Sequence, residues 1–216
     1  MKKLLILTLA CLVSPVFAQN ATPFCNAMKT YIHVKTRPGN PKYVTQYSRE
    51  AFLKMAHAEP SPYTLGLTVS KLTASVNTKP QLTEQDGQIC ITLKDVEVEL
   101  RYPELVVYID KKYSPSSCEY KTIKEHEDYH VAVAQQALSF FRTDIEREVS
   151  NAVSQIHPKT VYQRSEIQPV VNQYHRAITD ALAPVVAHIN KKLLEKNAAI
   201  DTKEMYAATT AVCKNW

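Results

Sequence analysis

Residues 124–130 read Lys-Glu-His-Glu-Asp-Tyr-His and contain the pattern H-E-x-x-H. On an α-helix, side chains four residues apart lie one turn apart on the same face. His126 and His130 could therefore bind one zinc ion through two imidazole nitrogens. Glu127 lies beside them and could act as general base toward a zinc-activated water. The stretch predicts a catalytic zinc site, on the condition that it forms a helix.

The surrounding sequence favours that helix. Ser116 and Glu119 form the pattern S-x-x-E, a capping box typical of a helix N-terminus. Apolar residues then recur at helical spacing up to Ile156, and Pro158 ends the pattern. A helix over residues 117–156 would be about 60 Å long, so we expect it to bend. The motif histidines lie on the flank of its apolar stripe, where they would face a groove beside the core.

At these residues the chain resembles a family of secreted bacterial proteins of unknown function, described as zinc-dependent proteases of the zincin-like, H-E-x-x-H type. The resemblance implies a metallopeptidase with His126 and His130 as zinc ligands and Glu127 as general base. It supplies neither a third ligand nor a substrate. The similarity runs from Cys118-Glu119-Tyr120 through His126-Glu127 to His130, with a weaker echo from Ile200-Asp201-Thr202 through Cys213 to Trp216.

The rest of the chain predicts an α+β fold. Between residues 63 and 113, alternating apolar residues indicate strands, with turns at Asp86-Gly87 and Tyr102-Pro103-Glu104. Shifts of phase inside these runs indicate bulges or bends. We therefore expect a small antiparallel β-meander followed by a long helical hairpin that carries H-E-x-x-H. Further expected elements are a strand near 31–34, a helix over 48–58, the second long helix over 169–196 and a short helix over 202–212.

A catalytic zinc ion needs a third protein ligand. If the two long helices pack as an antiparallel hairpin that turns near residue 158, the positions opposite the motif fall at about 188 to 195. His188 and Glu195 lie in this window, on the same flank of the second helix. We expect His188 as the third ligand, with Glu195 as its substitute. Asp201 and Glu204 are remoter candidates, because the tail could fold back.

Residues 1–18 have the features of a secretory signal peptide. Lys2 and Lys3 precede a short apolar run, and Val16-Phe17-Ala18 offers small residues at the positions that signal peptidase reads. Residues 19–216 would then form a single zincin-like α+β domain, periplasmic or secreted. The apolar run is too short to span a membrane, so no stable membrane insertion is expected after cleavage.

The four cysteines that follow the expected cleavage site predict two disulfides. Three pairings are possible. We expect Cys90 to bond with Cys118, joining a strand to the motif helix, and Cys25 to bond with Cys213, joining the two termini.

Composition argues against nucleic acid as a partner. The formal net charge is +5 at pH 7, and Lys2 and Lys3 supply two of those charges. The chain has no basic cluster and no glycine-rich phosphate loop. The expected function is an exported zinc metallopeptidase that acts on a peptide or protein substrate. The alternatives are a non-catalytic exported binding or structural protein with an incidental or structural metal site, and an enzyme that hydrolyses a cell-wall amide.

Overall fold

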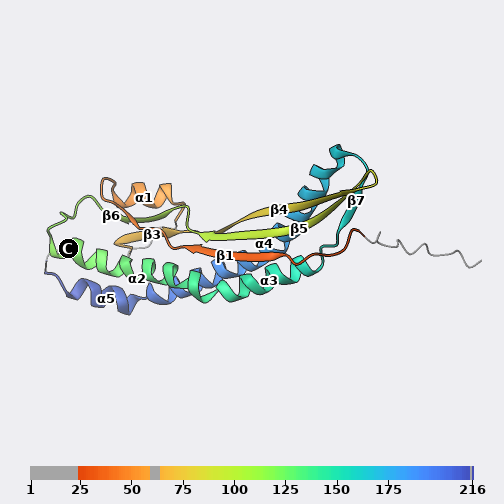
Figure 1. Cartoon of the computed structure of the whole chain (residues 1–216). Coiled ribbons are helices and arrows are strands. Elements are labelled where there is room, and N and C mark those ends of the chain that lie inside the picture. The colour runs from red at the N-terminus through yellow and green to blue at the C-terminus, as the bar shows by residue number, and fades with distance from the viewer. Residues whose placement is uncertain (1–23, 59–63, 215) are drawn as a thin grey trace, which may run out of the picture.

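The computed structural model describes residues 24–58, 64–214 and 216, so the expected signal peptide lies outside the described residues. The predicted α+β class is confirmed: two small sheets lie end to end along one side of a layer of long helices (Figure 1). The strands are β1 (Tyr31–Arg37), β2 (Lys42–Val44), β3 (Gly66–Ser70), β4 (Thr73–Gln85), β5 (Gln88–Arg101), β6 (Leu105–Ile109) and β7 (Lys159–Val161). The helices are α1 (Arg49–Met55), α2 (Cys118–Phe140), α3 (Arg142–Ser154), α4 (Ile167–Ile200) and α5 (Lys203–Ala211), with a 3₁₀ turn, η1 (Arg164–Glu166).

The sheets are built around one long β-hairpin rather than the expected three-stranded meander. β4 and β5 pair antiparallel and are joined by the predicted turn at Asp86-Gly87. Both turn residues have positive φ, 51° and 74°, which suits a two-residue turn between right-twisted strands. β1 adds to β5 in parallel, β7 pairs with the other end of β5, and β2, β6 and β3 form the second sheet.

The predicted phase shifts mark two different events. In β5 the ladder changes from Lys79–Asp95 pairing to Pro80–Leu93 pairing, so Lys94 is the extra residue of a β-bulge. The other shift separates β3 from β4, which belong to different sheets. At this break the Asn190 side chain of α4 accepts a hydrogen bond from the backbone N–H of Leu72 and donates one to its carbonyl, both at 3.0 Å. The crossing between the sheets is thereby fastened to the helix layer.

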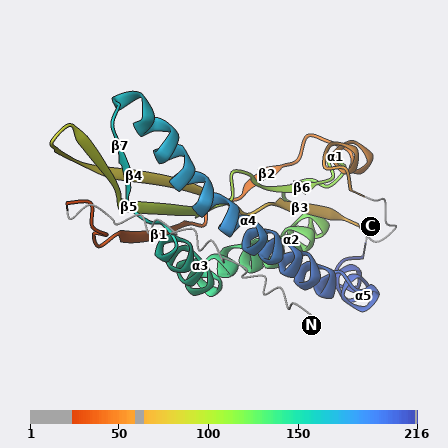
Figure 2. The same ribbon diagram turned by 90° about the vertical axis from the view of Figure 1, so that its right-hand side faces the viewer.

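The expected long motif helix bends, as predicted, and divides at Phe141 into α2 and α3. Its cap differs from the prediction by one residue: the Ser117 hydroxyl, not that of Ser116, accepts the hydrogen bond from the Tyr120 backbone N–H at 3.1 Å. The second long helix, α4, is longer than expected and packs against both α2 and α3. Figure 2 shows its end and α5 lying beside α2.

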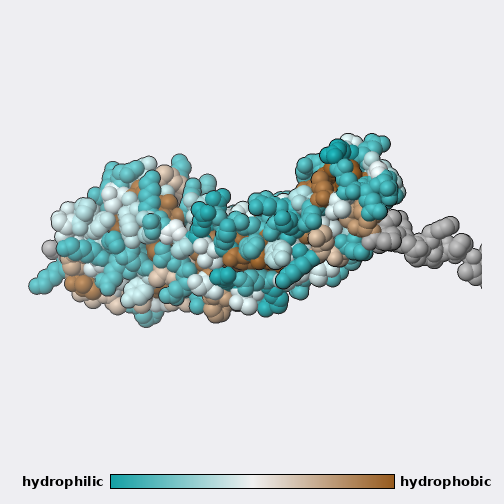
Figure 3. All heavy atoms as spheres, in the orientation of Figure 1, coloured by the Kyte–Doolittle hydropathy of each residue, from teal (hydrophilic) through white to brown (hydrophobic). Residues whose placement is uncertain are grey.

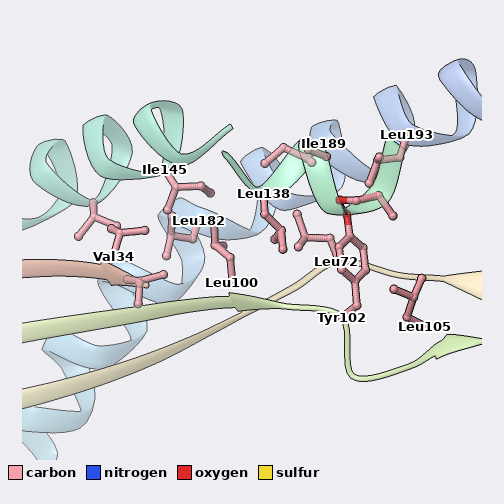
Figure 4. Packing of buried hydrophobic residues seen from close by; sticks show 14 of the residues in the cluster. Val34, Leu72, Leu100, Tyr102, Leu105, Leu138, Ile145, Leu182, Ile189 and Leu193 are labelled. Atoms are coloured by element: carbon pink, nitrogen blue, oxygen red, sulfur yellow. Dashed lines mark hydrogen bonds between the residues drawn. The ribbon is translucent and has the colours of Figure 1, made fainter. Parts of the chain in front are cut away.

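The core lies between the β4–β5 hairpin and the helices, as Figure 4 shows. Leu100 from β5, Ile145 from α3 and Leu182 from α4 meet there, each at most 2% exposed. Burying each of these side chains stabilises the fold by about 1.5 to 3 kcal/mol. Tyr102 also spans the layers, because its hydroxyl donates to the Ala134 carbonyl of α2 at 2.7 Å. This core holds α2 rigidly against the sheet.

The structure has two disulfides, as predicted in number, but the expected pairing is wrong. Cys25 bonds with Cys90 and Cys118 bonds with Cys213. The parallel register of β1 on β5, which matches Tyr31 with Asp95, brings the segment before β1 to the start of β5. The tail, for its part, folds back along α2 through α5. Two disulfides are consistent with an exported protein. Among the described helices, none is long and apolar enough to cross a membrane.

Candidate metal centre

Three ligating atoms converge between α2 and the junction of α4 with α5. The Asp201 Oδ1 atom lies 3.1 Å from His126 Nε2 and 3.1 Å from His130 Nε2, and the two Nε2 atoms are 3.4 Å apart. An ion held at 2.0 to 2.1 Å in tetrahedral geometry requires donor atoms about 3.3 to 3.4 Å apart. The distance between the two Nε2 atoms matches this value and the two distances to Asp201 are slightly shorter, so the three atoms lie close to the spacing of a three-ligand site with one position left open. Within residues 24–58, 64–214 and 216, this is the group of His, Cys, Asp and Glu side chains that could hold a metal ion.

The local sequence explains why these atoms meet. The i, i+4 spacing on α2 puts both imidazoles on one flank, and their side chains are only 5% and 6% exposed. Asp201 is the C-cap residue of α4, with ψ of 54°, so the helix ends there and the chain turns. The Thr202 hydroxyl then caps α5 by accepting from the Met205 N–H. The carboxylate of Asp201 is thus held at the corner between two helices.

Neighbouring side chains orient the three candidate ligands. Asn197 Oδ1 lies 3.1 Å from His130 Nδ1 and accepts its N–H, so Nε2 is the nitrogen that faces Asp201 and, once it has lost its proton, could bind a metal ion. The Tyr206 hydroxyl donates to Asp201 Oδ1 at 2.9 Å. Burial works against the charged form of His130, but its hydrogen bond to Asp201 and the negative charges of Glu127 and Asp201 outweigh it and raise the pKa of the imidazole.

The carboxyl of Asp201 shows the reciprocal effect. Burial would raise its pKa, but hydrogen bonds from His126 and His130 outweigh that and hold the pKa well below its usual range. Tyr206 is affected in the opposite sense. Its burial, followed by the charge of Asp201, raises the pKa of the phenol, so its hydroxyl remains a hydrogen-bond donor.

Glu127 is buried under β3, with 2% of its surface exposed. The Thr68 hydroxyl of β3 donates to its Oε2 atom at 2.8 Å. Burial raises the pKa of the carboxyl, although the charges of His130 and His126 and the Thr68 hydrogen bond partly oppose this. Gly66 permits the close approach of strand and helix, because a Cβ atom there would lie 2.7 Å from Glu127 Oε1. Any side chain at position 66 would push against the carboxylate.

The charge inside the motif points away from the metal group. Asp128, whose side chain is 41% exposed, accepts a hydrogen bond from the Tyr43 hydroxyl of β2 at 2.5 Å. It also pairs with Lys124 one turn earlier, at 2.7 Å. Asp128 therefore fastens β2 to the outer flank of α2, on the side away from the two histidines.

The expected third ligand is corrected by the structure. His188 is exposed and lines an apolar cavity with Val133, Phe140 and Lys192, about 20 Å along α4 from Asp201. Glu195 is exposed and pairs with Lys192 at 2.8 Å. β7 and η1 lengthen the connection between α3 and α4, so the residue opposite His130 is Asn197. The donor that completes the group is Asp201, one of the two remoter candidates, whereas Glu204 is exposed on α5.

Sequence reasoning missed the residues that support the site, although two of them left a signal. Gly66 is one of three glycines in the chain and stands at the start of an alternating run, where a glycine indicates close approach of another backbone or side chain. Asn197 lies four residues before Asp201, so both face one side of α4. Thr68 and Tyr206 carry no pattern of their own, because their partners are distant in sequence.

No family model, curated protein or solved structure matches this chain.

Proposed function

We propose that the protein is an exported zinc metallopeptidase, periplasmic or secreted, that hydrolyses peptide bonds with Glu127 as general base. One observation carries this proposal: two imidazoles and a carboxylate converge at close to tetrahedral spacing, beside a buried glutamate. The resemblance of residues 118–130 to secreted zinc-dependent proteases agrees with it. The two disulfides of the fold agree with export.

The donor set suits zinc, since His nitrogen and Asp oxygen are both common zinc ligands. A zinc ion held by His126, His130 and Asp201 would polarise the scissile carbonyl and lower the pKa of water to about 7. A closed structural zinc site takes a fourth protein ligand. In the described part of the chain the group has three, which leaves a place for water and substrate.

Glu127 then has two tasks, to accept a proton from the attacking water and to deliver one to the leaving amine. Its burial raises the pKa of the carboxyl above its usual range, which favours uptake of the proton from the attacking water. Thr68 orients the carboxyl through Oε2 and is a positioning residue. Gly66 keeps the space beside it clear.

Tyr206 is the tyrosine that we assign to the developing oxyanion. Its hydroxyl donates a hydrogen bond to Asp201 Oδ1, the oxygen that also contacts His126 and His130. A phenol with a raised pKa stays protonated at neutral pH. Its single O–H would turn from Asp201 Oδ1 to the carbonyl oxygen as negative charge develops there.

β3 is the strand that we assign to substrate alignment. It lies at the edge of the sheet ordered β2-β6-β3 and packs over α2 beside the motif. An extended peptide can add to such an edge by backbone hydrogen bonds. This arrangement would place the peptide along the strand that carries Gly66 and Thr68, next to Glu127.

The alternative is a non-catalytic exported binding or structural protein in which the same group holds a metal ion without turnover. The two proposals differ in what Glu127 does. In the metallopeptidase it moves protons, whereas in a binding protein it is a buried carboxyl that affects stability alone.

The deciding experiment measures metal content and turnover in the purified mature protein. We expect about one zinc ion per chain and cleavage within a mixed peptide library. Glu127→Gln should retain the zinc and lose about 100-fold to 10,000-fold in turnover. Glu204→Gln, an exposed carboxyl on the first turn of α5, is the matched control and should behave as wild type. Cell-wall fragments serve as a second substrate class. If the protein cleaves these fragments and no library peptide, its proposed substrate becomes a cell-wall amide instead of a peptide. If Glu127→Gln equals wild type on every substrate, the catalytic proposal fails.

A further inference from the structure

A cavity of about 300 Å³ shares a wall with the metal group. One side is formed by α2 through Thr122, Glu125, His126 and Tyr129, and the other by the end of α4 and by α5. His126 belongs to both the cavity and the donor set. The volume of the cavity is at the lower end of the range for small-ligand pockets, about 300 to 1,000 Å³, so the cavity suits a single large side chain.

The interior of this cavity is mainly apolar. Side chains at positions 205, 208, 209 and 212 line it from α5, a helical spacing that turns one face of the short helix inward. Met205 is 44% exposed and Val212 is 65% exposed, while Tyr129 at the opposite rim is 62% exposed. Apolar surface is also visible over the outer end of α5 in Figure 3. These large apolar side chains stand open to solvent beside a metal ligand.

Both walls of the cavity are held in place. The Cys118–Cys213 disulfide joins the start of α2 to the residue after Val212, and the Thr122 hydroxyl lies 3.4 Å from the Cys213 sulfur. At the other end, α5 is capped by Thr202 and tied to Asp201 through the Tyr206 hydroxyl. A pocket with fixed walls binds without paying the full cost of ordering its lining.

We infer that this cavity receives a bulky apolar side chain of the substrate, at a residue that adjoins the scissile bond. The inference rests on the proposed peptidase function, since the position of the bond is set by the metal group. His126 connects the cavity with the metal group: it lines the cavity, and its Nε2 atom is one of the three donor atoms. An extended substrate held beside Glu127 would direct one adjoining side chain across His126 toward Met205 and Ala208.

A negative charge at the rim of the cavity further limits which substrate side chains can enter it. Glu125 lines the mouth from α2 and is exposed. Its carboxylate repels Asp and Glu side chains of a substrate. The polar groups of the lining already have partners, because His126 contacts Asp201, the Thr122 hydroxyl contacts the Cys213 sulfur and the Thr209 hydroxyl donates to the Met205 carbonyl, so a buried carboxylate would lack one. Leucine, methionine and phenylalanine are therefore expected at this position, and acidic residues are expected to be excluded.

The first test profiles cleavage sites in a peptide library and compares two phenylalanine substitutions on α5. Wild type should prefer Leu, Met or Phe over Ala next to the bond by about 10-fold to 100-fold. Ala208→Phe fills the cavity and should lower kcat/KM for those substrates by about tenfold or more. Ala207→Phe, the neighbouring residue outside the cavity lining, is the matched control and should keep the wild-type profile.

The second test needs no turnover. The methyl group of Met205 is followed by NMR in zinc-loaded Glu127→Gln while N-acetyl-leucinamide or N-acetyl-aspartamide is added. We expect a saturable shift with the leucine compound, no shift with the acidic one, and loss of the shift in the Ala208→Phe background.

The two tests separate the failures. A library profile without apolar preference, together with an unmoved Met205 methyl, overturns the pocket while the peptidase stands. A Met205 shift without cleavage of any library member upholds the pocket and overturns the proposed function.

Discussion

The two ends of this elongated molecule are each fastened by one disulfide, yet they differ in the kind of side chain that they bury. At one end, Cys25–Cys90 ties the segment before β1 to the long β4–β5 hairpin. The interior there is mainly apolar, and the Tyr174 hydroxyl has partners in the carbonyls of Ile91 and His157, at 3.1 and 2.9 Å. That end is constructed as an ordinary protein core.

At the other end, Cys118–Cys213 closes the tail over α2. Here the buried positions include His126, Glu127 and His130, each no more than 6% exposed. Buried ionisable groups destabilise a fold unless they are paired, and groups with shifted pKa values cluster at functional sites. The contrast indicates that apolar packing at the Cys25–Cys90 end stabilises the fold, whereas the Cys118–Cys213 end holds buried ionisable groups together at a cost in stability.

The largest effect on metal binding is expected from Asp201→Ala. Removing one of the three proposed ligands should weaken zinc affinity by more than about 100-fold, a larger loss than is typical for a supporting residue. The measurement is competition with a zinc chelator of known affinity. Glu204→Ala, three residues further along the chain, should leave affinity unchanged, and Asn197→Ala should lose about tenfold. Equal affinities for Asp201→Ala and wild type would remove Asp201 from the site.

Removing the disulfides one at a time sharpens the comparison between the ends. The bonded cysteines are 65 and 95 residues apart in sequence, so chain entropy predicts a similar loss of stability, about 4 kcal/mol for each. Only the Cys118→Ala/Cys213→Ala protein should also bind zinc more weakly, by about tenfold, because α5 holds the groups around Asp201. Denaturant unfolding and zinc titration of both double variants check this. Equal zinc affinity in the two would show that the tail needs no covalent tie.

Two glycines test the same contrast at single positions. Gly66→Ala should strain the contact with Glu127 and cost about 1 to 3 kcal/mol, with a marked loss of turnover. Gly87→Ala meets no neighbour but occupies a φ of 74°, so it should cost about 1 kcal/mol and leave turnover intact. Unfolding curves and kcat/KM are measured for both. A fully active Gly66→Ala protein would argue against close packing of β3 on the carboxylate.

The smallest effect concerns pH and the metal-free protein. Burial raises the pKa of Glu127, so the folded state keeps a proton that the unfolded chain releases above about pH 4.3. Wild type should therefore lose stability relative to Glu127→Gln as the pH rises above the unfolded pKa of about 4.3 and through the raised pKa of the folded state. The two proteins are compared at about pH 4.5 and about pH 8. At the other end, burial raises the pKa of Tyr174 to about 12. Tyr174→Phe should cost about 1 kcal/mol, unchanged over this pH range. The free energy of unfolding is measured at both pH values. A difference between wild type and Glu127→Gln that does not change with pH would contradict the raised pKa of Glu127.

Local pattern predicted much of the fold because the elements involved are set by neighbours in sequence. The Asp86-Gly87 turn, the helix over α2 with its bend, and α5 were all expected, since turn residues and helical periodicity act over a few positions. The cap of α2 was predicted one residue early, at Ser116 instead of Ser117. The bulge at Lys94 was predicted only as a shift of phase in the strand pattern. β1 was expected as a strand, but its parallel pairing with β5 was not, and β2 was not expected, because nothing within those strands encodes which strand they join.

The candidate site divides in the same way. The sequence by itself determined that His126 and His130 share one helix flank with Glu127 beside them, because an α-helix converts a spacing of four residues into a shared face. Only the tertiary structure decided that Asp201 completes the group, that Thr68 and Gly66 surround Glu127, and that Cys118 bonds with Cys213. Those contacts depend on how far α4 runs past the motif after β7 and η1, and the register of distant elements comes from packing of the whole core rather than from any local pattern.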